Sequence, residues 1–86
     1  MVSIPQLINF ELLSAGSSLW STVECDRRHD RWVVYANLRP VEGGTEEAFS
    51  KSERLLKDVL DRRLSARDWL AVVLCGDRVS HTVRPD

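Results

Sequence analysis

The chain has few cysteines, glycines and prolines. Its 86 residues include two cysteines, four glycines and three prolines. Small secreted scaffolds that rely on disulfides usually carry about four to eight cysteines, so we expect a reduced, cytoplasmic protein. The two thiols are expected to pack as small hydrophobic groups. A bridge between Cys25 and Cys75 stays open, because two strands could bring them together.

Long apolar runs are also missing. The longest near-continuous one, Trp69 to Cys75, is far shorter than the ~20 residues of a membrane helix. The N-terminal residues lack a basic region followed by an apolar run, so we expect no secretory signal. Hydrophobic residues make up 43% and charged residues 29% of the chain, which excludes disorder of the whole chain. At about 100–200 residues per domain, residues 1–86 are expected to form one domain.

Net positive charge is absent as well. Twelve basic residues stand against thirteen acidic ones, which gives a net charge of −1. Electrostatic nucleic-acid binders usually have a pI above about 9, so that class is not expected. Ten of the basic residues are arginine. Arginine binds carboxylates and phosphates and is enriched at protein interfaces, although a GC-rich coding sequence would produce the same excess.

The clearest element present is a helix over about residues 46–64. Thr45 is a suitable N-cap, acidic residues follow it, and basic residues end the segment, as the helix dipole favours. Leu56, Val59 and Leu60 lie on one helical face.

Two hairpins are predicted around this helix. The first joins residues 19–25 to residues 32–39 through a charged loop, with Cys25 opposite Trp32. Its core face is then formed by Leu19, Val23, Cys25, Trp32, Val34, Ala36 and Leu38. Its other face carries Trp20, Thr22, Glu24, Val33, Tyr35 and Asn37.

The second hairpin turns at Gly76-Asp77. This turn pairs Leu74 with Val79, Val72 with His81 and Leu70 with Val83, and it places these six residues on one face. The alternative is a helix over residues 66–75, because Ser65-Ala-Arg-Asp68 resembles a capping box.

The first fifteen residues fit two interpretations. Ser3-Ile-Pro-Gln6 could cap a helix. A helix would set Glu11 in its apolar stripe, however, and residues 8–12 alternate with period two, so we prefer a strand over residues 7–13. The predicted fold class is α+β, a single small two-layer domain. Its antiparallel sheet has the order β-β-β-α-β-β, and the helix at about 46–64 packs on one face.

Catalytic and metal-binding signals are weak. Cys25, Asp26, His29 and Asp30 are close in sequence, but zinc sites usually show paired cysteines, and a solvated loop is the expected reading. Cys25 with His29 or His81 would make a nucleophile and a base, a set that arises by chance in such a chain. No phosphate-binding loop or nucleophile elbow is present. We therefore expect no enzyme, no metal and no cofactor.

Three surface features remain. The first is an aromatic face on the first hairpin, formed by Trp20, Val33 and Tyr35, which either binds a partner protein or packs under Phe10, Leu12 or a second copy. The second is a basic loop that would border this face or contact phosphates, formed by Arg27, Arg28, His29 and Arg31. The third is an acidic surface that either imitates phosphates or is simply solvated, formed by Glu42, Glu46, Glu47, Asp58 and Asp61.

These features favour a small non-enzymatic protein-binding module without a membrane segment. Chains of this size and composition often act as stoichiometric inhibitors or antidotes, such as anti-CRISPR proteins of phages and mobile elements, immunity proteins and antitoxins. A nucleic-acid-associated accessory protein that uses the Arg27–Arg31 loop is one alternative. A self-associating structural subunit is another, so the chain is expected as a monomer or a homodimer.

Overall fold

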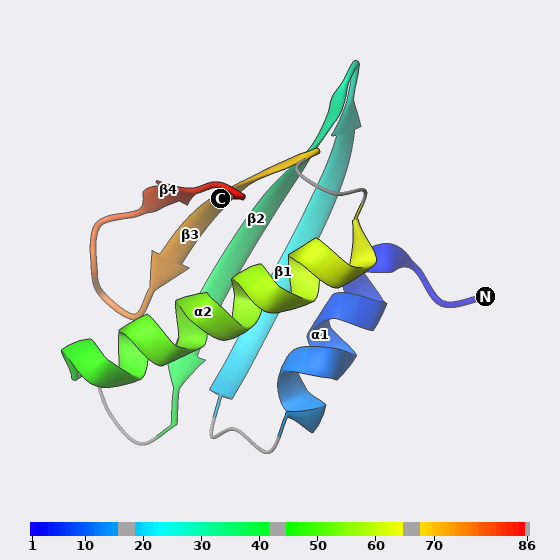
Figure 1. The fold of residues 1–86 in the computed structure, drawn as a ribbon. Helices are drawn as coiled ribbons and strands as arrows, with labels where there is room; N and C mark the ends of the chain where they lie inside the picture. Colours follow the sequence, from blue (N-terminus) through cyan, green and yellow to red (C-terminus); the bar gives the residue numbers. More distant parts are fainter. Residues whose placement is uncertain (16–18, 42–44, 65–67, 86) are drawn as a thin grey trace.

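The described part of the chain contains two helices and four strands (Figure 1). The computed structural model describes residues 1–15, 19–41, 45–64 and 68–85. In chain order the elements are α1 (Ile4–Ser14), β1 (Leu19–Arg28), β2 (Arg31–Pro40), α2 (Glu46–Arg63), β3 (Trp69–Cys75) and β4 (His81–Val83). Within the described ranges, no helix is long and apolar enough to cross a membrane.

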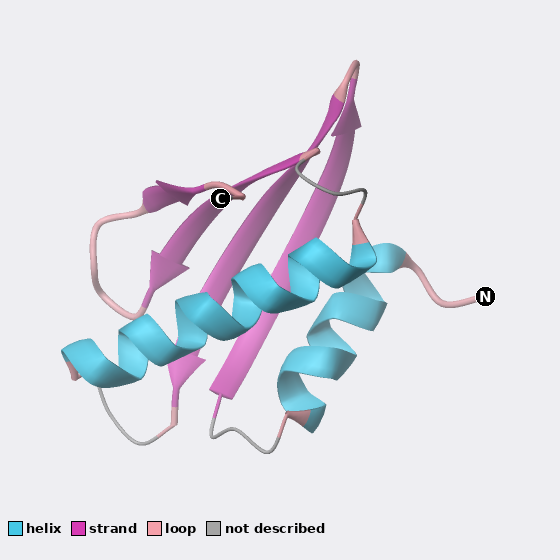
Figure 2. Ribbon diagram, in the orientation of Figure 1, coloured by secondary structure: helices cyan, strands magenta, loops and turns pink. Residues whose placement is uncertain are grey.

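The strands form one sheet in the order β1-β2-β3-β4, and both helices lie on the same face of it (Figure 2). The predicted α+β class, with the main helix packed against a sheet, is confirmed. The prediction of an all-antiparallel sheet is wrong, because β2 and β3 pair in parallel. The reason is the crossover: α2 carries the chain back along the sheet, so β3 starts beside the start of β2.

The main helix begins and ends close to its predicted bounds. The Thr45 hydroxyl accepts a hydrogen bond from the Ala48 amide at 3.1 Å, and acidic and basic residues occupy the first and last turns. Leu56, Val59 and Leu60 are fully buried against the sheet. Several local signals agree here, and this agreement explains why the sequence alone predicts this element well.

The N-terminal segment is a helix, so the predicted strand over residues 7–13 is wrong. The Ser3 amide donates to the Gln6 side chain at 2.8 Å, and the Gln6 amide donates to the Ser3 hydroxyl at 3.3 Å. These two bonds are the reciprocal capping box that the sequence offered as an alternative. Ile8 and Leu12 of α1 are fully buried in the core.

Glu11, the residue that argued against a helix, faces α2 instead of the apolar core. Its carboxylate lies 2.6 Å from the Arg63 guanidinium and 3.4 Å from that of Arg62. The hydrogen bond from Arg63 lowers the pKa of Glu11 below its ordinary value, a shift that partial burial opposes. The acid in the apolar stripe therefore joins the two helices, through partners more than fifty residues away.

We expect Glu11→Gln to lower the free energy of unfolding by on the order of 1 kcal/mol at pH 7. A carboxyl whose pKa is depressed in the folded state stabilises the fold above its unfolded pKa, and this contribution disappears as the pH falls through the folded pKa. The difference between wild type and variant should therefore shrink as the pH falls below about 4.5, the ordinary pKa. Urea unfolding at several pH values measures it, and a pH-independent difference would contradict the ion pair.

The first hairpin has the predicted faces but a different register. Cys25 pairs with Val34 instead of Trp32, and the turn contains only His29 and Asp30. The charged residues of the expected loop extend the two strands. Because the register differs by two residues and side chains alternate with period two, every residue keeps its predicted face.

The second hairpin differs by one residue, and this changes its faces. Residues 69–75 form a strand, not a helix, but Val73 pairs with His81 where Val72 was expected. Leu70, Val72 and Leu74 therefore lie on the face away from the helices, while His81 and Val83 lie on the helix side. The connection spans residues 76–80, longer than the predicted two-residue turn, because Arg78 turns onto α2.

The core lies between the helices and the sheet. It is formed by Ile8, Leu12, Leu19, Val23, Val34, Ala36, Leu38, Phe49, Leu56, Val59, Leu60, Leu64, Trp69, Ala71, Val73 and Cys75. Some sequence predictions fall outside the described residues. These are most of the Ser65–Asp68 box and Glu42 of the acidic surface.

Candidate functional site

The sheet surface opposite the helices is the candidate site, and we call it the open face. Buried and more accessible residues alternate along β1, β2 and β3, so one row per strand points away from the helices. The open face consists of Trp20, Thr22, Glu24, Val33, Tyr35, Asn37, Leu70, Val72 and Leu74. The described part of the chain places no helix over it (Figure 2).

Apolar side chains dominate the middle of the open face. Val33 lies opposite Leu70 and Tyr35 opposite Val72 across the parallel pair, so two strands contribute adjoining apolar rows. Trp20 is 66% exposed and Tyr35 is 44% exposed. Leu74 is 38% exposed, and it continues the row toward the end of β3. The three sequence-predicted residues Trp20, Val33 and Tyr35 thus share one surface, with three further aliphatic residues from β3.

The open face has two shallow hollows, and Asn37 lines both of them. One, of about 280 Å³, is lined by Tyr35, Val72 and Leu74, and the other, of about 240 Å³, lies beside Trp20 and Arg39. Both include Asn37, whose Oδ1 atom is inaccessible to solvent and accepts no hydrogen bond from the described residues. A buried acceptor without a donor lowers the stability of the folded chain.

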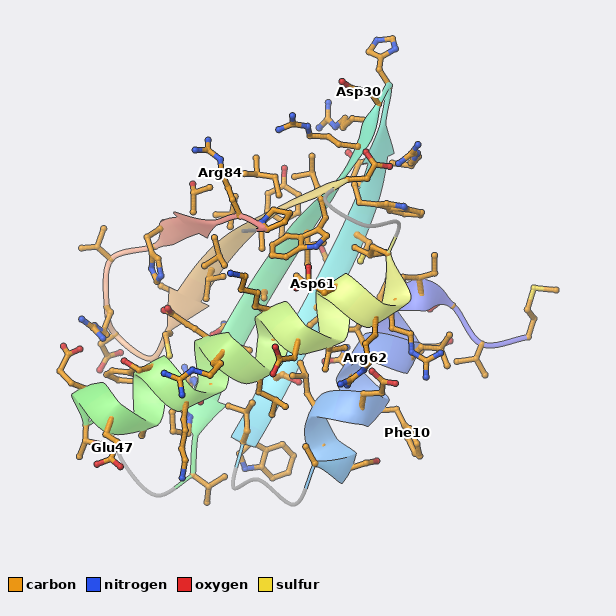
Figure 3. The ribbon with its side chains drawn as sticks, viewed as in Figure 1. Phe10, Asp30, Glu47, Asp61, Arg62 and Arg84 are labelled. Atoms are coloured by element: carbon orange, nitrogen blue, oxygen red, sulfur yellow. The ribbon has the colours of Figure 1, made fainter. Side chains whose placement is uncertain are left out.

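The basic hairpin loop is largely neutralised. Arg27 lies 2.9 Å from Asp68 and stacks over the Trp32 ring at 5.4 Å, which directs its charge toward the helix side. Arg28 pairs with Asp26 at 2.8 Å. His29 and Asp30 form the exposed tip of the hairpin, where Figure 3 labels Asp30.

Two arginines of β2 keep their charge available at opposite ends of the strand. Arg31 and Arg39 share the open-face side of β2, and both are exposed. Among the described residues neither has an ion-pair partner. Arg39 lies opposite Trp20 across the β1–β2 pair. The apolar middle of the open face is therefore bordered by positive charge at both ends of β2.

The acidic surface is not a continuous row. Glu46 binds Arg78 at 2.7 Å, and Arg78 also stacks over the Phe49 ring at 4.9 Å. Asp61 accepts a hydrogen bond from the Trp69 indole at 3.0 Å. All four described acidic residues are exposed, but Glu46 and Asp61 have these partners, and Glu47 and Asp58 are eleven residues apart, about 16 Å along α2, too far for one phosphate-like line.

Neither thiol has the surroundings of an activated nucleophile. Burial raises the pKa of Cys25 to about 11, and it also raises the pKa of Cys75, so both are protonated at neutral pH. Both thiols are free, and the alternative of a bridge between them is wrong. Cys25 pairs with Val34, whereas Cys75 pairs with Leu38, about 13 Å further along β2.

The candidate catalytic and metal-binding sets are not assembled. Cys25 faces the helices, whereas His29 lies in the exposed turn. His81 lies on β4, at the opposite edge of the sheet from Cys25 on β1. Its Nε2 atom lies 2.7 Å from the carboxylate of Glu53 in α2. No group of three or more metal-ligating side chains occurs in the described residues.

The sequence interpretation missed the contribution of β3 to the open face. Leu70, Val72 and Leu74 were assigned to a shared face with His81 and Val83, which the pairing separates. The other row of the same strand contains Trp69, Ala71, Val73 and Cys75, all buried. Cysteine and tryptophan in one alternating row were the available signal that this row faces the core.

Comparison with known proteins adds no family assignment. No family model matches the chain, and neither the curated proteins nor the solved structures contain a significant match to it.

Proposed function

We propose that this protein is a non-enzymatic binding module that contacts a partner protein through the open face. The observation that carries the proposal is a four-stranded sheet that the described residues cover with helices on one side, while its other side exposes Trp20, Tyr35 and Leu74. Tryptophan and tyrosine are the residues that most often contribute binding energy at protein interfaces. Contiguous apolar patches on small proteins commonly mark such interfaces.

The chemistry of the open face supports a protein partner over a nucleic acid. Its middle contains four aliphatic side chains beside Tyr35, and aliphatic groups neither stack on bases nor contact phosphates. Two arginines of the hairpin loop, Arg27 and Arg28, are already paired with carboxylates. Phosphate affinity depends on positive charge that is not compensated in this way.

The partner surface that fits best has an apolar centre and acidic groups at its border. Arg31 and Arg39 supply the complementary positive charge, and arginine pairs well with carboxylates in a fork geometry. The mode of action that we propose is occupation of the partner's surface, as in stoichiometric inhibitors and antidotes, anti-CRISPR and immunity proteins among them.

The test is a side-chain footprint of the complex. The partner is captured on the immobilised chain, purified, and mixed with free chain, and hydroxyl-radical labelling is compared with and without it. We expect a defined stoichiometry and protection of Trp20, Tyr35 and Leu74. Val79, which is 90% exposed in the loop after β3, should be labelled equally in both samples. Protection confined to α2, with an unchanged open face, would contradict the proposal.

A further inference from the structure

The two hollows of the open face carry opposite charges. The Trp20 hollow, of about 240 Å³, is lined by Trp20, Ser21, Thr22, Asn37 and Arg39. The Tyr35 hollow, of about 280 Å³, shares Thr22 and Asn37 with it, and its other lining residues include Glu24, Tyr35, Val72 and Leu74. A guanidinium therefore borders one hollow and a carboxylate borders the other, on either side of a common wall.

Arg39 brings to the Trp20 hollow a charge that no described residue compensates. It pairs with Trp20 across β1 and β2, which sets the two Cβ atoms about 5 Å apart. Two other arginines near aromatic rings, Arg27 and Arg78, each stack on a ring and also bind a carboxylate. Among the described residues Arg39 makes neither contact, so its guanidinium donors and the Trp20 ring are both available to a partner.

Glu24 gives the Tyr35 hollow the opposite character. It lies opposite Tyr35 across the same two strands, and it is exposed, with no ion-pair partner within the described ranges. Tyr35 is four residues from Arg39, about 13 Å along β2. A carboxylate in the Tyr35 hollow would meet a like charge, whereas the same group in the Trp20 hollow meets Arg39. The two hollows thus distinguish one orientation of a bound segment from the other.

The size of the hollows suits single side chains. Pockets for drug-sized molecules enclose about 300–1,000 Å³, and both hollows are smaller than that. Anchoring side chains at protein interfaces fill small pockets of this kind. Because the hollows adjoin at Thr22 and Asn37, one segment of a partner can place two neighbouring side chains in them at once.

We propose that the partner protein places an acidic side chain, Asp or Glu, in the Trp20 hollow and a large uncharged apolar side chain in the Tyr35 hollow. This inference rests on the proposed function and names the partner's chemistry at the open face. Arg39 binds the carboxylate through its planar fork, and the Trp20 ring covers the carbon atoms of the acidic side chain. The aliphatic row of β3 contacts the apolar side chain. Arg39 is then the residue that determines specificity, and Glu24 rejects a segment bound in reverse.

The first experiment is zero-length cross-linking of the complex, with the partner captured on the immobilised chain. A carbodiimide joins an amine directly to a carboxylate in contact with it, and arginine does not react. Arg39→Lys keeps the positive charge and supplies the amine, so mass spectrometry should find an amide bond from position 39 to one Asp or Glu of the partner. Arg54→Lys is the matched control, because Arg54 is exposed on α2, on the helix side of the sheet, and should give no cross-link.

The affinity of the purified partner is the second measurement. Arg39→Gln should bind about tenfold or more weakly than the wild type, because the charge-assisted fork is lost, and its affinity should depend less on salt. Arg54→Gln and Glu24→Gln should bind at least as tightly as the wild type, because neither removes a contact to the partner. All three altered side chains are exposed, so the variants are expected to fold, which circular dichroism verifies.

The results that would overturn this inference differ from those that would overturn the proposed function. Footprint protection of Trp20 and Tyr35 without a cross-link from Arg39→Lys would mean that the open face binds a partner but not through a carboxylate at Arg39. Wild-type affinity of Arg39→Gln, or a loss of about tenfold for Glu24→Gln, would also contradict the assigned charges. A cross-link from Arg54→Lys alone, with the open face unprotected, would reject the proposed function together with this inference.

Discussion

The double variant Trp20→Ala/Tyr35→Ala is expected to lose affinity for its partner by roughly 100-fold or more. Each aromatic side chain at the centre of an interface commonly contributes about 2 kcal/mol or more, and about 1.4 kcal/mol corresponds to tenfold in affinity. Both side chains are well exposed in the free protein, so their truncation removes little of the core. Calorimetric titration of purified partner measures the loss.

Controls separate binding from folding in this experiment. Val79→Ala changes another exposed apolar residue and should bind like the wild type. Tyr35→Phe keeps the ring and should bind within about tenfold of it. The thermal midpoint of the double variant should stay close to that of the wild type. Unchanged affinity of the double variant would exclude the open face as the binding surface.

Trp69→Ala is expected to have the largest effect on stability, about 3–5 kcal/mol. Trp69 is 2% exposed at the start of β3, where its ring packs in the core and its indole donates to Asp61 at the end of α2. The substitution leaves a cavity and removes this link between helix and sheet. Small domains have a free energy of unfolding of only about 5–15 kcal/mol, so a large fraction of the variant molecules should unfold on mild heating.

Trp69→Phe is the matched control, and it separates burial from the hydrogen bond. It keeps most of the apolar contact and loses only the donor to Asp61, so we expect a loss of about 1 kcal/mol. Urea unfolding followed by far-UV circular dichroism measures both variants. A loss below about 1 kcal/mol for Trp69→Ala would mean that the core does not depend on this ring.

The sequence predicted elements whose signals are local. The main helix carries its cap, its charges and its apolar face within one segment, and its bounds agree to within one residue. The faces of the first hairpin were also predicted, although its register was not, since a two-residue shift preserves the alternation. Trp20, Val33 and Tyr35 consequently lie together on the sheet surface where they were expected.

Long-range contacts decided the elements that the sequence predicted wrongly. Glu11 was the reason to predict a strand in place of the N-terminal helix. In the structure Arg62 and Arg63, at the far end of α2, compensate its charge. Likewise, the alternation in β3 could not say which row faces the core. In the structure Trp69 and Cys75 are buried on the helix side of the sheet, so Leu74 lies on the open face.

The sequence by itself determined the fold class, the main helix and the aromatic row of the first hairpin, because these follow from capping, charge and period-two alternation within short segments. Only the tertiary structure decided that β2 and β3 run in parallel, that β3 adds an aliphatic row to the open face, and that two of the loop arginines are already paired. These properties depend on which residues meet across the fold. An interaction between two residues that are far apart in the sequence leaves no pattern in either segment alone.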